Sequence, residues 1–182
     1  MKRIVLLTLS MLVMASIASA QISGTIAVFA DEGRVGCRIT DAPGLVHAYV
    51  YHMSSDGTEA STFRLVLNGG AALVHVTDVF KIGLQLGSTI AGVAISYQAC
   101  LTSPIYLADV LFTGTGTSPA CSSIDVTNHP DFAFPEAVDC QTPKGKAEVA
   151  TLSAMIGGDN ASCPCPVPVA EMTWGSIKAL YN

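Results

Sequence analysis

The stretch Ser88–Gly114 reads STIAGVAISYQACLTSPIYLADVLFTG. Two apolar runs in it are separated by a short polar break that contains Cys100 and Pro104. In the second run, Ile105–Phe112, nearly every residue on both alternating sides is apolar or small, and Asp109 is the exception. Strands that are buried on both faces have this pattern. The stretch therefore predicts two strands near the middle of a two-layered β structure.

Other short apolar segments lie between turn residues on both sides of this stretch. Strands are expected at Ile22–Ala30, Leu45–Met53, Thr62–Leu67, Ala71–Phe80, Cys121–Thr127 and Ala137–Asp139. Lys81–Gly87 has the composition of a loop, and Ala147–Ile156 is interpreted as a last strand because many strands precede it. Short strands split by Gly, Pro, Asn and Asp predict an all-β sandwich of about eight or nine strands.

The N-terminal residues 1–20 have the organisation of a secretory signal. Lys2 and Arg3 are followed by the apolar Ile4–Met14 and by the small residues Ala18–Ala20. The apolar segment is too short to form a stable membrane span. We expect cleavage before Gln21, export of the chain, and no membrane span after cleavage.

The charge of the chain is modestly acidic. The formal net charge is −5, and it becomes −7 once the two basic residues Lys2 and Arg3 are removed. The remaining basic residues are scattered, and only Lys144 and Lys146 lie close together. Without a basic stripe, nucleic acid and anionic membranes are not expected partners.

The even number of cysteines predicts a disulfide framework in an exported chain. All six follow the signal: Cys37, Cys100, Cys121, Cys140, Cys163 and Cys165. We expect Cys37 to pair with Cys100 and thereby tie the first loop to the centre of the domain. We expect Cys121 to pair with Cys140 across a Pro-rich segment. Cys163 and Cys165 would then bond to each other or to a component outside the domain.

The composition changes after residue 156, which divides the chain into a signal (1–20), a sandwich domain (21–156) and a tail (157–182). Pro164, Pro166 and Pro168 form an extended spacer in the tail. The predicted docking residues are Thr173, Trp174, Gly175, Ile177, Lys178, Leu180 and Tyr181. They favour a short helix capped by Thr173, too short to be stable alone, that docks on a partner or sorting machinery. The alternative is that Trp174 folds back over an open sheet face.

Several motifs carry a resemblance to known proteins. They are Phe29-Ala30-Asp31, Gly36-Cys37, Ala60-Ser61-Thr62-Phe63-Arg64, Gly92-Val93-Ala94-Ile95, Ala99-Cys100, Val138-Asp139-Cys140 and the closing Thr-Trp-Gly-x-Ile-Lys-x-Leu-Tyr. With them the chain resembles a group of uncharacterised secreted bacterial proteins, and its β region is similar to immunoglobulin-like and cohesin-like sandwiches. The resemblance implies export and this fold. The C-terminal position of the last motif implies a recognition or sorting element.

Candidate chemistry is sparse, and no residue is assigned as catalytic, cofactor-binding or metal-ligating. The four histidines, His47, His52, His75 and His129, have no metal-ligand spacing. Turn carboxylates (Asp31, Glu32, Asp41 and Asp56) are interpreted as local hydrogen-bond acceptors rather than calcium ligands. Aromatic residues that would form a carbohydrate platform are Trp174, Tyr49, Tyr51, Tyr97 and Tyr106, although tyrosines in strands usually pack.

These observations favour an exported, non-enzymatic β-sandwich that acts in binding or assembly without a cofactor. Its expected location is extracellular or at the cell surface, with the periplasm as the alternative. Two alternative functions stay open: a carbohydrate-binding module with a polysaccharide ligand, and a secreted hydrolase whose loops assemble a carboxylate pair, such as Glu32 with Asp41.

Overall fold

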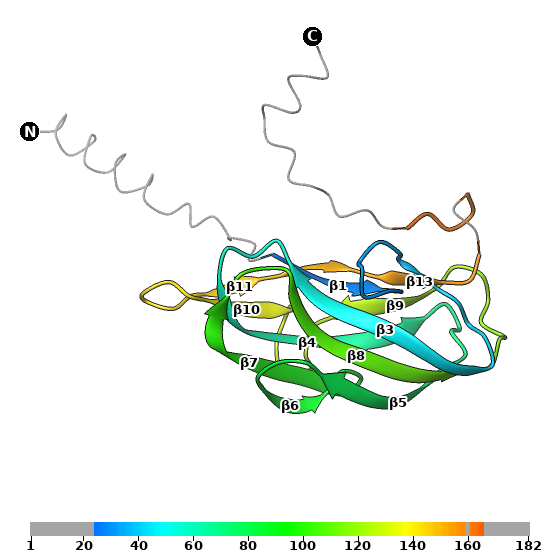
Figure 1. Ribbon diagram of the computed structural model, residues 1–182, viewed down its shortest axis with the longest axis horizontal. Helices are drawn as coiled ribbons and strands as arrows, with labels where there is room; N and C mark the ends of the chain where they lie inside the picture. Colours follow the sequence, from blue (N-terminus) through cyan, green and yellow to red (C-terminus); the bar gives the residue numbers. More distant parts are fainter. Residues whose placement is uncertain (1–23, 159–160, 166–182) are drawn as a thin grey trace, which may run out of the picture.

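The stretch Ser88–Gly114 forms two long strands that lie in different sheets. The computed structural model describes residues 24–158 and 161–165. In it, β7 (Gly92–Leu101) belongs to one sheet and β8 (Ile105–Gly114) to the other. The polar break that contains Pro104 carries the chain from one layer to the next (Figure 1).

The first sheet has β3 and β8 at its centre. Its strand order is β12 (Ala150–Leu152), β1 (Thr25–Phe29), β3 (Gly44–Met53), β8 and β5 (Leu73–Phe80). β3 and β8 are antiparallel over nearly their full lengths, and β5 is the exposed edge.

The second sheet is built around β4 (Thr58–Asn68). One side of β4 pairs with β7, which in turn pairs with the edge strand β6 (Leu84–Ser88). The other side pairs with two strands in succession, β10 (Glu136–Asp139) and β9 (Ser122–Thr127). Beyond them lie β11 (Lys146–Glu148) on β10, and β13 (Ala154–Ile156) with β2 (Arg38–Ile39) on β9.

The predicted single strand Ala147–Ile156 is three short strands instead. β11 belongs to the second sheet, β12 pairs in parallel with β1 of the first, and β13 returns to the second and pairs in parallel with β2. The segment is interrupted because each part bonds to a different neighbour. This division, together with β2 and β6, raises the number of strands in the described residues to thirteen, above the predicted eight or nine.

The predicted loop Lys81–Gly87 is also wrong, because it contains most of β6. Four of the five residues of β6 are exposed, so its sequence lacks the buried alternation that marks the inner strands. The all-β sandwich itself is confirmed, and the described residues contain no helix.

The core fills the space between the two sheets. Val46, Ala48 and Val50 of β3 point into it, as their spacing predicts. The strict alternation predicted for β8 fails at one point, because a β-bulge leaves Leu107 as an extra residue between the pairs Val50–Ala108 and Tyr51–Tyr106. Leu107 and Ala108 are therefore both buried, and Tyr106 points to the outside.

Both predicted disulfide pairings are wrong. The bonds are Cys37–Cys165, Cys100–Cys140 and Cys121–Cys163, with Cα–Cα distances of 5.9, 5.7 and 5.3 Å. Cys100 meets Cys140 because Leu101 and Asp139 both pair with Thr58 at the start of β4.

Cys163 and Cys165 are bonded to the sandwich rather than to each other. Arg38 reinforces this attachment by donating hydrogen bonds to the carbonyl oxygens of Gly157 (2.6 Å) and Cys163 (2.7 Å). The described part of the segment after residue 156 therefore packs against the domain. The predicted docking residues, Thr173–Tyr181, lie outside the described residues.

Candidate functional site

The outer side of the second sheet carries an exposed apolar surface, which we call the leucine face. It consists of Leu84, Leu86, Ala94, Ser96, Ala60 and Thr62. Paired residues of antiparallel strands point to the same side of a sheet. Leu84 therefore lies beside Ser96, and Leu86 beside Ala94. The intervening Ile95 is buried, so the leucines point outward, with 60% and 71% of their surfaces exposed.

Small side chains surround the two leucines. A hollow of about 160 Å³ lies over this part of the sheet, and Leu84, Leu86, Ala60 and Thr62 are among the residues that line it. Because alanine, serine and threonine project only a short distance, the sheet surface beside the leucines is low. A partner could therefore approach the backbone of β4 and β7 closely.

Charged residues continue the same surface across β10 and β11. The register places Val138 beside Lys146, and Glu136 beside Glu148. Lys146 Nζ lies 3.5 Å from a carboxylate oxygen of Glu136 and 5.2 Å from the ring centre of Phe132. The outer surface of the sheet therefore changes from apolar at β6 to charged at β11. This asymmetry could fix the orientation in which a partner binds.

The outer side of the first sheet is aromatic, and we call it the tyrosine face. It consists of Phe29, Tyr49, Tyr51 and Tyr106 on β1, β3 and β8. The rings of Tyr51 and Tyr106 stack with centroids 4.6 Å apart, and Phe29 meets Tyr51 edge-on at 6.0 Å. Tyr51 is 6% exposed and Phe29 7% exposed. Three of the four tyrosines of the predicted platform thus come together.

The chain itself covers much of this aromatic surface. The guanidinium carbon of Arg34 lies 5.4 Å from the ring centre of Tyr51, and Lys81 Nζ lies 5.3 Å from that of Tyr106. The Tyr51 hydroxyl donates a hydrogen bond to the carbonyl oxygen of Glu32 (3.0 Å). Burial raises the pKa values of the Tyr51 and Tyr106 hydroxyls above their usual range. Ring faces that contact each other and cations do not form an open stacking platform.

The remaining predicted tyrosine is elsewhere. Tyr97 is buried in the core, where its hydroxyl donates to Ser61 Oγ (2.8 Å) and contacts His52 Nδ1 (3.1 Å). Burial raises the Tyr97 pKa above its usual range. His47 is on the outside instead, with Nδ1 3.0 Å from a carboxylate oxygen of Asp109. Trp174 lies outside the described residues.

The turn carboxylates bond to backbone N–H groups within the loops. Asp31 accepts hydrogen bonds from Val35 N (3.3 Å) and Gly36 N (2.6 Å) of its own loop. Asp41 accepts from Gly116 N (3.0 Å) and Ser118 N (2.8 Å). These bonds hold the Asp41 pKa below its usual value, and the bond from Gly116 N has the largest effect.

The structure does not bring together Glu32 and Asp41, the carboxylate pair named for a hydrolase. Glu32 lies beside Tyr51 and Asp41 beside Gly116, near opposite ends of β3. Within residues 24–158 and 161–165, no group of three or more His, Cys, Asp or Glu side chains has the arrangement of a metal site. In the same residues no helix is long and apolar enough to cross a bilayer.

Sequence reasoning missed the leucine face. The alternation of Leu84, Gln85 and Leu86 is a weak strand signal. The preceding Lys81 and Gly83 favour a loop, so the segment was interpreted as one. The small residues Ala60, Thr62 and Ala94 become neighbours of the leucines only through the strand register.

The β-sandwich fold of the described residues is similar to that of cohesin modules. Its fold is similar to the sixth cohesin of Acetivibrio cellulolyticus scaffoldin B, solved in complex with a mutant Cel5 dockerin. The TM-score is 0.50 at 9% identity, over 74% of this chain and 98% of that one. A complex of CaCohA2 with a CaDoc0917 variant gives a TM-score of 0.51 at 13% identity, over 74% and 99% of the two chains. No protein-family model and no curated protein matches the sequence.

Proposed function

We propose that this chain is an exported, non-enzymatic module that binds a protein partner in an extracellular or cell-surface assembly, and that the leucine face receives this partner. The observation that carries the proposal is the exposure of Leu84 and Leu86 on a surface of small residues. Exposed apolar patches with polar rims are typical of protein interaction sites.

The shape and chemistry of the leucine face fit a protein better than a small molecule. The hollow that Leu84 and Leu86 help to line has a volume of about 160 Å³. This volume is below the usual range of about 300–1,000 Å³ for small-ligand pockets. Two projecting leucines can enter pockets on a partner and act as its central anchors, while the charged pair Lys146–Glu136 forms part of a polar rim. The cross-strand register that begins at Leu86 of β6 leads across the sheet to Glu136 of β10 and Glu148 of β11. A basic group on the partner would meet these carboxylates there.

The comparisons support the assembly role as an analogy of fold. Both cohesin structures reported above were solved in complexes with a dockerin partner, and both match this chain over almost their whole length. The export of the chain is supported by its N-terminal signal pattern and by three disulfides, which persist in oxidising compartments. The periplasm is the alternative location.

The tail after residue 165 belongs to the same proposal as a docking or sorting element, whose target is either a partner or this domain. Its support is the sequence alone: an aromatic anchor at Trp174 after a proline-rich spacer. A polysaccharide ligand is less well supported, because Tyr51 and Tyr106 contact each other and cations rather than an open surface.

Affinity capture from the exported proteins of the source cell tests the proposal. Immobilised residues 21–182 should retain a specific protein, and the double variant Leu84→Asp, Leu86→Asp should retain at least tenfold less of it. Val35→Asp is the matched control, because Val35 is 91% exposed but lies away from the leucine face. Retention of the same protein by the double variant, or no retention by the wild type, would contradict the proposal.

A further inference from the structure

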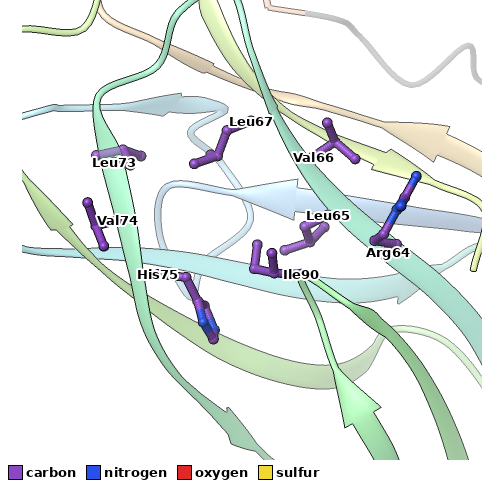
Figure 2. A pocket seen from close by; sticks show the side chains of 8 residues that line it. All are labelled: Arg64, Leu65, Val66, Leu67, Leu73, Val74, His75 and Ile90. Atoms are coloured by element: carbon purple, nitrogen blue, oxygen red, sulfur yellow. The ribbon is translucent and has the colours of Figure 1, made fainter.

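An apolar groove of about 440 Å³ opens along one side of the sandwich, between β4 and β5 (Figure 2). We call it the edge groove. Its apolar lining consists of Leu65, Val66, Leu67, Leu73, Val74 and Ile90. Val74 forms an exposed lip with 64% of its surface accessible. The groove is separate from the leucine face, with which it shares no lining residue.

The groove lies where β4 and β5 each have a strand edge without a neighbouring strand. The β4–β7 ladder ends where Phe63 pairs with Val93, and one further bond joins Leu65 N to the carbonyl oxygen of Thr89 (2.7 Å). Past this bond, no strand of the described residues pairs with that side of β4. β5 pairs with β8 alone. Two strand edges with apolar side chains therefore face solvent, which folded proteins usually avoid by covering them.

A polar contact closes one end of the groove. Asp78 of β5 accepts hydrogen bonds from Thr89 N (2.9 Å) and Thr89 Oγ1 (2.6 Å), and His75 Nε2 lies 2.9 Å from its carboxylate. Thr89 is fully buried, so this contact joins the edge of the first sheet to the second. The other end of the groove, toward the β4–β5 turn, is not closed by this contact.

That open end lies beside one of the two disulfides that attach residues 163–165 to the domain. Gly69 of the β4–β5 turn has a positive φ of 67°, and a Cβ on it would lie 2.9 Å from Ser122 Cα. Ser122 Oγ also donates to the Gly69 carbonyl oxygen (2.9 Å). The preceding residue, Cys121, is bonded to Cys163. The Cys121–Cys163 bond thus holds residue 163 near the mouth of the groove, and Cys165 is bonded to Cys37 beside β2.

We propose that Trp174 of the same chain docks in the edge groove. Nine residues lead from Pro166 to Trp174 and span about 28 Å when extended. The groove has the volume for an indole, which is apolar over most of its 150–250 Å² or so of surface. The short tether from Cys165 raises the effective concentration of Trp174 at the groove to about the millimolar range. Docking in cis covers the two open edges without a second chain.

The fluorescence of Trp174 reports this docking directly, because it is the one tryptophan in the sequence. In the chain 21–182, Trp174 emission should be blue-shifted and shielded from acrylamide. Val74→Asp places a charge on the groove lip and should shift the emission to the red, with several-fold stronger quenching. Leu84→Asp changes a leucine of similar exposure outside the groove, and it should leave both readings unchanged.

Three results would overturn the proposal. The first is a wild-type Trp174 that is quenched as freely as a tryptophan peptide in water. The second is a Val74→Asp variant that retains wild-type emission and quenching. The third is an emission shift that disappears on dilution, which would mean that the groove holds the tail of another copy. As a second measurement, Trp174→Ala should lower the melting temperature by several degrees, and an unchanged value would contradict the covering role.

Discussion

The two outer faces of the sandwich differ in whether the chain covers its own apolar surface. On the tyrosine face, Tyr51 and Tyr106 stack on one another, and Arg34 and Lys81 lie over them. On the leucine face, Leu84 and Leu86 project from alanine, serine and threonine and remain largely exposed. Apolar side chains are therefore mostly covered on one outer surface of the sandwich and exposed on the other.

The difference separates residues that stabilise the domain from residues that remain accessible to another molecule. Tyr51 and Phe29 are almost fully buried, although they lie on the outer side of a sheet. The burial of these two rings therefore contributes to the stability of the folded domain. Leu84 and Leu86 bury little surface in the free chain, so their substitution should cost little stability. The predictions below test this separation.

The largest expected effect is on the sheet that carries the leucine face. Replacing Cys100 and Cys140 by Ser removes a bond with a sequence separation of 40 residues, which corresponds to about 4 kcal/mol of unfolding free energy in the chain-entropy model. Urea denaturation of the oxidised wild type and the double variant measures the difference. A loss below about 1 kcal/mol would show that β7 and β10 are held in place without the bond.

Tyr51→Ala should destabilise the domain by about 3 kcal/mol, because it removes a buried ring from the stack with Tyr106 and Phe29. Leu86→Ala is the control from the other face, and it should change the unfolding free energy by less than about 0.5 kcal/mol. Chemical denaturation of both variants gives the comparison. Equal losses would abolish the distinction between the two faces.

A smaller effect is expected in alkaline solution. Burial, and then the nearby carboxylate of Asp109, raises the pKa of the Tyr106 hydroxyl above the usual value of 10.0. The neutral hydroxyl therefore stabilises the fold below pH 10, and this contribution is lost as the pH rises through the raised pKa. Phenolate absorbance should show late-ionising tyrosines, one fewer of them in Tyr106→Phe than in the wild type. A wild-type chain whose tyrosines all ionise near pH 10 would contradict the covered tyrosine face.

The sequence predicted the parts of the fold that alternate around a buried side. The burial of a strand face produces a local pattern of apolar residues in the sequence. The pattern is visible in the apolar β8 and in Val46, Ala48 and Val50 of β3. The edge strand β6 was missed for the converse reason. Its Leu84 and Leu86 are exposed, so no pattern of burial marks them.

Features that depend on long-range register could not be predicted. The bulge at Leu107 shifts which residues of β8 point outward, and it is this shift that brings Tyr106 onto Tyr51. The disulfide pairs depend on which strand ends meet, and spacing along the chain does not determine this. The leucine face likewise exists only where β6, β7 and β4 align. The tyrosines of the predicted platform were identified by type, but their mutual stacking was not.

Site-specific photo-crosslinking tests the docking role of the leucine face most directly. A benzophenone amino acid at position 86 of the chain 21–182, exposed to the exported proteins of the source cell, should form one specific adduct. The same amino acid at position 49, on the tyrosine face, should form none, and Leu84→Asp should remove the adduct at position 86. An adduct at position 49 but not at 86, or one at 86 that Leu84→Asp leaves intact, would contradict the account.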